Sequence, residues 1–130
     1  MIKLFLLVGL GSALGGIGRF GVSHWMATRQ LDSFPYGTLS VNVLGSFLIG
    51  VLFYVTLPEG RWPLDQSWRE LLLVGFCGGF TTFSTFSFQV LEQLREEQWL
   101  AAGANVVLSV VLCVLAVAAG ITAARWLNPG

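Results

Sequence analysis

The residues best suited to chemistry lie in one apolar segment, residues 75–88, which reads GFCGGFTTFSTFSF. The segment holds three glycines and five hydroxyl residues among five phenylalanines. Adjacent glycines followed by adjacent threonines are poor material for a continuous helix. A helix that breaks inside a membrane can present its carbonyls to a cation and its amides to an anion. The segment therefore predicts an ion site, and the alternative reading is a kinked helix used only for packing.

A pair of aromatic rings follows the predicted break. Phe83 and Phe86 share one face of a helix because they are three residues apart. The edge of an aromatic ring is electropositive, so such rings can line an anion path without a charge that would trap the ion. Thr82, Thr85 and Gln89 form a neighbouring polar stripe. By itself, a phenylalanine pair at this spacing more often faces lipid or a core.

Polar side chains spaced by four residues mark other apolar segments. Thr38, Asn42 and Ser46 form the first such line, and Asn42, a neutral amide, needs a partner in lipid, either another helix or a conducted ion. Asn105, Ser109 and Cys113 form a second polar line near the C-terminus. Hydrogen bonding between helices is the ordinary explanation of both lines.

Arg19 is the only charged residue well inside an apolar segment. An arginine at membrane depth is costly and is therefore a functional candidate. It lies toward the end of its segment, so its side chain could reach the interface and draw anions toward a vestibule. We expect an anion-attracting or structural role.

The elements that must position these residues follow from the distribution of charge. The chain has 130 residues, of which 55% are hydrophobic and 11% charged, whereas a soluble domain carries about a quarter charged residues. Residues 33–58, 71–91 and 99–124 carry no charge, and residues 4–28 carry only Arg19. Each run meets the roughly 20 residues needed to cross a bilayer. The sequence predicts an all-α, multi-pass protein of the cell (inner) membrane, a single domain over residues 1–130, with spans near 3–26, 36–57, 68–97 (interrupted near 78–82) and 99–126.

Several classes of function lack their usual residues. No Asp or Glu lies in the interior of a predicted span, and no nucleophile–base pair, metal motif or phosphate loop is visible. We therefore expect no enzymatic activity. The formal net charge of +0 offers no basic patch, so we expect no nucleic-acid partner.

The orientation of the chain in the membrane is only weakly determined by its charges. Lys3, Arg61, Arg69 and Arg125 fall on the side shared by the termini and the middle loop, whereas Arg29 and Arg95 fall on the other. This is a weak bias by the positive-inside rule. Either a single orientation or insertion both ways is open, and the latter permits an antiparallel two-fold dimer.

Residues 75–87, GFCGGFTTFSTFS, resemble the hallmark segment of the Fluc (CrcB-type) fluoride channel family almost throughout. The segments GTLSVN at 37–42, with Gly45, and GGIGRF at 15–20 support the resemblance, which covers essentially the whole chain. It implies a passive fluoride-selective channel that exports fluoride and lowers its cytoplasmic concentration. It also implies an antiparallel, dual-topology homodimer with a structural sodium ion buried on its two-fold axis.

The resemblance implies roles for individual residues. The backbone carbonyls of Gly78 and Thr81, from both subunits, would hold the sodium ion. Phe83 and Phe86 would line the fluoride pore, with Asn42 as its asparagine. The remaining positions would lie on the polar track beside the pore or, for the last, at its vestibule: Thr82, Thr85, Ser109 and Arg19.

Two positions depart from patterns common in that family. Gln89 stands where a glutamate is frequent, and Cys113 where a further hydroxyl is expected. Both affect the chemistry of one pore end. An amide still donates and accepts hydrogen bonds, so Gln89 is retained as a vestibule or structural residue.

Two other functions were weighed against a fluoride channel. A small four-helix, dual-topology multidrug or cation exporter would need a carboxylate within the membrane. A non-transporting membrane subunit held by small-residue packing would tolerate loss of the phenylalanine pair, whereas a fluoride pore would lose flux.

Overall fold

The protein is helical throughout its described elements. The structure, a computed structural model, describes residues 1–29 and 34–128. Its elements are α1 (Ile2–Ala27), α2 (Tyr36–Val55), α3 (Gln66–Glu70), the π-helix η1 (Leu71–Cys77), α4 (Gly78–Phe80), α5 (Phe83–Arg95) and α6 (Trp99–Leu127). Together α3, η1, α4 and α5 form one span, Gln66–Arg95. Four helices are thus long and apolar enough to cross a membrane, which confirms the predicted number of spans.

The helix ends lie within two residues of the approximate span limits expected from the sequence. Helix α2 ends at Val55 rather than 57, because Pro58 disfavours helical geometry in the residue that precedes it. The third span begins at Gln66 rather than 68 and ends at Arg95 rather than 97. The backbone of Glu97 has φ 60°, in the left-handed region, and cannot continue a right-handed helix.

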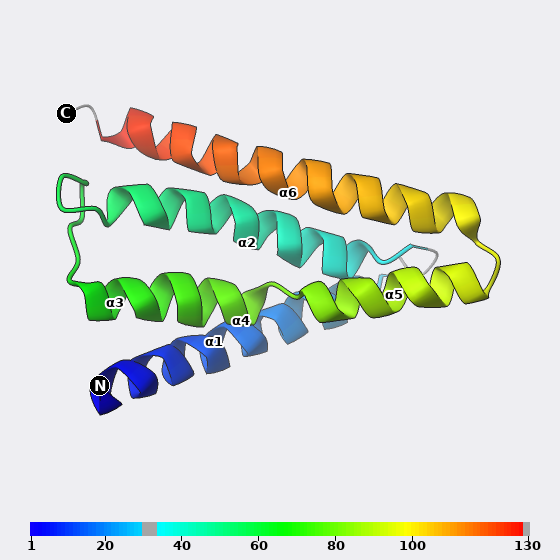
Figure 1. The fold of residues 1–130 in the computed structure, drawn as a ribbon, viewed down its shortest axis with the longest axis horizontal. Coiled ribbons are helices and arrows are strands. Elements are labelled where there is room, and N and C mark those ends of the chain that lie inside the picture. Colours follow the sequence, from blue (N-terminus) through cyan, green and yellow to red (C-terminus); the bar gives the residue numbers. More distant parts are fainter. Residues whose placement is uncertain (30–33, 129–130) are drawn as a thin grey trace.

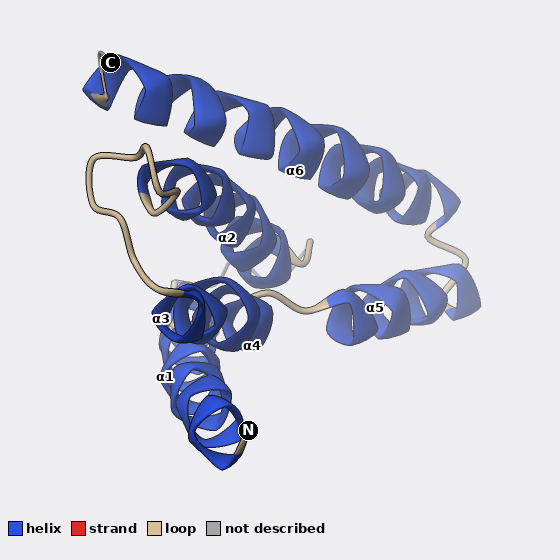
Figure 2. Cartoon of the chain, turned by 60° about the vertical axis from the view of Figure 1, so that its left-hand side comes forward, coloured by secondary structure: helices blue, strands red, loops and turns tan. Residues whose placement is uncertain are grey.

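The spans lie side by side in a fixed order. Helix α6 lies along α2, and α1 packs against η1 and α4 (Figure 1). Helix α5 packs mainly on α6, so the two halves of the third span have different neighbours and diverge, as Figure 2 shows. Both termini lie at one end of the molecule. At that end Arg61 Nη1 donates a hydrogen bond of 3.0 Å to the Leu127 carbonyl oxygen.

Glycines allow α1 to approach the third span closely. A Cβ atom at Gly11 would overlap the carbonyl oxygen of Leu71, and one at Gly15 would overlap that of Phe76. Gly75 faces Gly11 in return. Small residues that let backbones meet are a recurrent basis of helix packing in lipid. The contact holds the first half of the third span against α1, up to the point where the span breaks.

The break in the third span falls on two threonines, as extended residues between α4 and α5. Thr81 has φ −87° and ψ 160°, and Thr82 has φ −153° and ψ 111°. The adjacent glycines, which suggested the break, are themselves helical: Gly78 has φ −65° and ψ −36°. The predicted interruption near 78–82 is therefore confirmed in its existence but is narrower, because the glycines remain helical, with Gly79 packed against Ser12, and the threonines make the turn.

Candidate functional site

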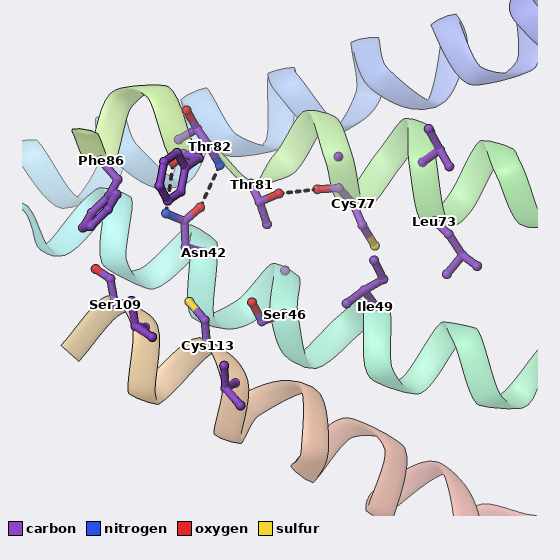
Figure 3. Close-up of a pocket in the computed structure, with 16 residues that line it drawn as sticks. Asn42, Ser46, Ile49, Leu73, Cys77, Thr81, Thr82, Phe86, Ser109 and Cys113 are labelled. Atoms are coloured by element: carbon purple, nitrogen blue, oxygen red, sulfur yellow. Dashed lines mark hydrogen bonds between the residues drawn. The ribbon is translucent and has the colours of Figure 1, made fainter. Parts of the chain in front are cut away.

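Asn42 holds the peptide groups at the break. Its Nδ2 donates a hydrogen bond of 3.1 Å to the Thr82 carbonyl oxygen, and its Oδ1 accepts one of 2.7 Å from the Thr82 backbone N–H (Figure 3). Both backbone groups of Thr82 are therefore satisfied by one side chain from α2. A helix-breaking residue at membrane depth needs such a partner, since no water is present to replace the lost helical bonds.

The same arrangement releases carbonyl oxygens near the break. In a continuous helix the Gly78 carbonyl would accept from the Thr82 N–H, which instead donates to Asn42. The Thr81 carbonyl would accept from the Thr85 N–H, which instead donates to Thr82 Oγ1 at 3.2 Å. Of the two intervening carbonyls, of Gly79 and Phe80, that of Gly79 accepts from Arg19 Nε at 3.1 Å. Gly78 and Thr81 are therefore left without the bonds that helical geometry would give their carbonyls.

These carbonyls fit a hard monovalent cation. Backbone carbonyl oxygens are neutral, hard ligands, the type that alkali and alkaline-earth ions prefer over nitrogen or sulfur. Gly78 and Thr81 lie at the C-terminal end of a helical segment, where the helix dipole is negative. Gly78 is also exposed on the single chain, so a carbonyl set from a second chain could complete the coordination.

Helix α5 begins at the break with a side-chain cap. Thr82 Oγ1 accepts from the Thr85 backbone N–H and donates to Thr85 Oγ1 at 3.0 Å. The N-terminal end of α5 carries backbone N–H groups that have no partner within the helix, together with the positive end of its dipole. Negative charge is favoured at such a helix end.

A groove of about 560 Å³ lies between α2, the third span and α6. Its wall is apolar apart from hydroxyl, thiol and amide groups, and none of the described residues that line it carries a charge. Gly78 and Phe83 are exposed, so the groove opens at the surface of the single chain. The residues that line it are Asn42, Gly45, Ser46, Ile49, Leu73, Val74, Cys77, Gly78, Thr81, Thr82, Phe83, Phe86, Ser109, Val110, Cys113 and Val114.

The phenylalanine pair stands at the start of α5 and lines the groove. The ring centroids of Phe83 and Phe86 are 5.3 Å apart, and the rings are tilted by 54°. Phe86 is 8% exposed, whereas Phe83 is 77% exposed and projects from the chain. Tilted rings turn an electropositive edge toward a neighbour. Phe86 thus presents a buried ring to the groove, and Phe83 lies at its rim.

A second, more polar cavity of about 420 Å³ lies where α1, α2 and α5 end. Gln89 lines it, and the buried Gln89 Oε1 has no hydrogen-bond partner in the part of the chain that the structure describes. Gln93, one turn further along α5, also lines it. The full lining is Ser23, Met26, Ala27, Phe34, Pro35, Tyr36, Gly37, Thr38, Gln89, Glu92, Gln93, Glu96 and Gln98.

The structure brings most of the predicted site residues together. The groove gathers Asn42, Phe83, Phe86, Thr82 and Ser109, with Gly78 and Thr81 at the break. Thr85, Gln89 and Arg19 lie elsewhere: Thr85 contacts the cap of α5, Gln89 the second cavity, and Arg19 the Gly79 carbonyl. The predicted stripe of Thr82, Thr85 and Gln89 therefore does not line one surface.

One polar residue was missed from the sequence. Gln93 is 8% exposed and accepts from Asn105 Nδ2 at 3.2 Å across the α5–α6 hairpin. The spacing of four residues between Gln89 and Gln93, on the same face of a helix, was an available signal.

Comparison with known families finds one whose sequence model matches most of this chain. A family model described as "CrcB-like protein, Camphor Resistance (CrcB)" matches residues 6–121. The match includes the second and third spans, most of the first and fourth, the break and every predicted site residue.

Several curated relatives are similar over nearly their whole lengths. A protein of Opitutus terrae is 49% identical over 127 residues, covering 98% of this chain and 96% of the relative. A protein of Paramagnetospirillum magneticum is 48% identical, covering 95% of this chain and 97% of the relative. One of Coxiella burnetii is 43% identical, covering 94% and 98%. Each of these relatives is named "Fluoride-specific ion channel FluC".

Proposed function

The chain belongs to the CrcB-like family, and from this premise we propose that it is a passive, fluoride-selective ion channel. The observation that carries the proposal is the groove in which Asn42, Phe86 and Ser109 meet beside the broken helix. Near-full-length relatives named fluoride-specific channels support the same ion. The protein is a channel and not an enzyme.

The groove suits a small, strongly hydrated anion. Such an ion passes only if the path replaces its lost hydration with donors. Hydroxyl groups, the remaining N–H of Asn42 Nδ2 and aromatic edges provide donors at low charge. The N-terminal end of α5 adds a positive potential without a titratable group. A path of this kind attracts the anion and does not hold it so tightly that it cannot leave.

The active unit proposed here is an antiparallel homodimer. The weak bias of positive charge between the two ends of the chain, four against two, supports insertion in both orientations. Exposure of Phe83 and Gly78 on the single chain supports a second chain at the open side of the groove. The carbonyls of Gly78 and Thr81, from both chains, would hold a structural sodium ion, which supplies positive charge that favours anions.

The direction of transport follows from acid–base chemistry. Hydrogen fluoride is a weak acid that crosses membranes uncharged and dissociates in a neutral cytoplasm. A passive channel then lets the anion leave down its electrochemical gradient. Energy coupling is unnecessary, which accords with the uncharged lining of the groove.

Fluoride efflux from liposomes tests the proposal. Purified protein is reconstituted in vesicles loaded with fluoride, and release is followed with a fluoride electrode while chloride is followed in parallel. We expect fast fluoride release, negligible chloride release, and loss of flux in Phe86→Ile. The matched control is Phe88→Ile, an exposed phenylalanine of the same helix that does not line the groove. Absence of fluoride release from a folded wild-type protein would overturn the assignment.

Dimerisation and the cation have tests of their own. Crosslinking in vesicles should give a dimer. Removal of sodium should lower the thermal stability of this dimer. The control keeps sodium and replaces its counter-anion, sulfate, by another inert anion, which should have a smaller effect. A monomer that conducts would contradict the dimer, and a thermal stability that does not depend on sodium would contradict the sodium site. Neither result would contradict the channel assignment.

A further inference from the structure

Hydrogen-bonded side chains cross the wall between the groove and the second cavity. Ser109, which lines the groove, donates from its hydroxyl to Asn105 Oδ1 at 3.2 Å. Asn105 Nδ2 donates in turn to Gln93 Oε1 at 3.2 Å, and Gln93 lines the second cavity. Asn105 is 2% exposed and touches neither space. The Ser109–Asn105–Gln93 chain is therefore a continuous polar connection through an otherwise apolar wall.

The hydrogen bonds of the Ser109–Asn105–Gln93 chain all run in the same direction. Each group donates toward the second cavity, so the last unused donor of the series is the amide nitrogen of Gln93. Within residues 1–29 and 34–128, Gln93 Nε2 donates to no protein group. A purely structural link between α5 and α6 needs only the Gln93 oxygen that Asn105 uses. The nitrogen is left to face the cavity.

Charge around the second cavity leaves Gln93 as an available neutral donor. Glu92 and Glu96 also line the cavity; Glu92 is paired with a cation, whereas Glu96 accepts from a neutral amide and keeps its negative charge. Glu92 Oε1 pairs with Arg95 Nη1 at 3.2 Å, and Glu96 Oε2 accepts from Gln98 Nε2 at 2.9 Å. Gln93 combines a buried position, a fixed oxygen and a nitrogen with no protein acceptor.

We propose that Gln93 is a residue of the ion path: its Nε2 binds the anion in the second cavity, and Asn105 fixes the amide in that orientation. This inference rests on the proposed channel function and adds a binding position beyond the groove. The second cavity is then an ion vestibule, joined to the groove by the Ser109–Asn105–Gln93 chain.

The Ser109–Asn105–Gln93 chain also links anion binding at Ser109 to anion binding at Gln93. When an anion in the groove takes the Ser109 hydroxyl, Asn105 Oδ1 loses its donor. A buried acceptor left without a donor is unfavourable. An anion at Gln93 leaves both internal bonds in place. Binding at Ser109 is therefore less favourable than binding at Gln93, which lowers the occupancy of the Ser109 position relative to that of Gln93.

Substitutions that separate the two atoms of the Gln93 amide test the inference. Gln93→Glu keeps an oxygen for Asn105 and removes the donor, whereas Gln93→Met removes both. The matched control is Gln98→Glu, which adds the same charge at the same cavity outside the chain. Each variant is checked for wild-type dimer content and then for fluoride conductance as a function of fluoride concentration. We expect more than tenfold loss in Gln93→Glu and Gln93→Met, and a smaller loss in Gln98→Glu than in Gln93→Glu.

The outcomes separate the possible explanations. Wild-type flux in Gln93→Glu, with loss only in Gln93→Met, would show a structural role and overturn the inference. Equal loss in Gln98→Glu would show a general effect of charge and overturn it too. If wild-type protein fails to conduct, the proposed function itself is at fault.

A measurement on unaltered protein covers the case in which the variants do not fold. Protein labelled with ¹⁵N-glutamine is titrated with sodium fluoride or sodium chloride. We expect the side-chain N–H resonances of Gln93 to shift with fluoride and not with chloride, while those of Gln98 stay in place. Gln93 resonances indifferent to fluoride would overturn the inference.

Discussion

At the scale of single residues, the break in the third span depends on one asparagine. Asn42 uses its oxygen and its nitrogen on the two backbone groups of Thr82, so it is first of all a partner for the broken helix. One N–H of its amide is left over for an ion. Asn42 thus positions the start of α5, with Phe83 and Phe86, before it contributes any donor of its own.

We predict that Asn42→Ala destabilises the protein and abolishes fluoride flux. The variant leaves a backbone N–H and a carbonyl oxygen at the break without partners, and each such buried group costs about 1–3 kcal/mol. The measurements are thermal unfolding in detergent and efflux from liposomes. The control for the unfolding measurement is Ser46→Ala, one turn further along α2 and in the same groove. An Asn42→Ala protein as stable as the wild type would show that the break does not need the two hydrogen bonds from Asn42.

At the scale of elements, close helix contacts and helix ends hold the fold. Helix α1 meets η1 and α4 through glycines, and α6 meets α2 through Gly50 and Gly120, whose added Cβ atoms would each meet a backbone carbonyl of the other helix. Helix α5 ends in a pair of bonds, from Glu97 N–H to the Leu94 carbonyl and from Gln98 N–H to the Gln93 carbonyl. This Schellman arrangement ordinarily uses glycine at the left-handed position.

Gly15→Ala should separate α1 from the third span. A methyl group there overlaps the backbone carbonyl of Phe76, and overpacking of this kind costs about 1–3 kcal/mol. We expect a lower thermal midpoint and reduced flux. Gly9→Ala, in the same helix, is the matched control, because no neighbouring atom lies within 4 Å of a Cβ added at that position. If both variants behave alike, the glycine contact is not what holds α1.

Glu97→Gly should stabilise the end of α5. Glu97 has φ 60°, and a side chain in the left-handed region costs about 1–2 kcal/mol that glycine avoids. Part of this gain is offset by the greater freedom of glycine in the unfolded chain. We expect a thermal midpoint a few degrees higher with unchanged efflux. A lower midpoint would mean that the Glu97 side chain makes a compensating contact.

At the scale of the whole molecule, the distribution of positive charge between the two ends bears on the proposed antiparallel dimer. The termini and the α2–α3 loop lie together, with Arg61 bound to the Leu127 carbonyl. The opposite end carries Arg29 and Arg95. An antiparallel dimer needs both orientations of the chain, so its yield depends on keeping these ends nearly equivalent.

Arg95→Gln should bias insertion toward one orientation. The variant removes one of the few positive charges at its end, while its exposed ion pair with Glu92 contributes at most about 1 kcal/mol to stability. We expect C-terminal fusions to green fluorescent protein and alkaline phosphatase to change from comparable signals to one dominant signal. Flux per milligram should fall in parallel. Unchanged fusion signals would show that orientation is set by something other than this charge.

Local sequence patterns predicted the spans and the existence of the break, because these depend on charge-free runs and on helix-breaking residues. The position of the break could not be predicted so closely. It depends on Asn42, 40 residues away, which pairs with Thr82 rather than with the glycines. The π-helix η1 has no signal in its residues, LLLVGFC. Gln93 was missed because its burial comes from α6, on the far side of a hairpin.

The two hydrogen bonds between Asn42 and the backbone of Thr82 have a consequence for how positions 42 and 82 change in evolution. Asn42 bonds the backbone of residue 82 and not its side chain. Every amino acid except proline offers the same N–H and carbonyl, so the contact places no demand on which residue occupies position 82. Statistical covariation between positions 42 and 82 should therefore be absent among homologous sequences, although the two residues touch. The constraint will show itself only as invariance at position 42, and contact maps derived from coevolution should leave this pair out.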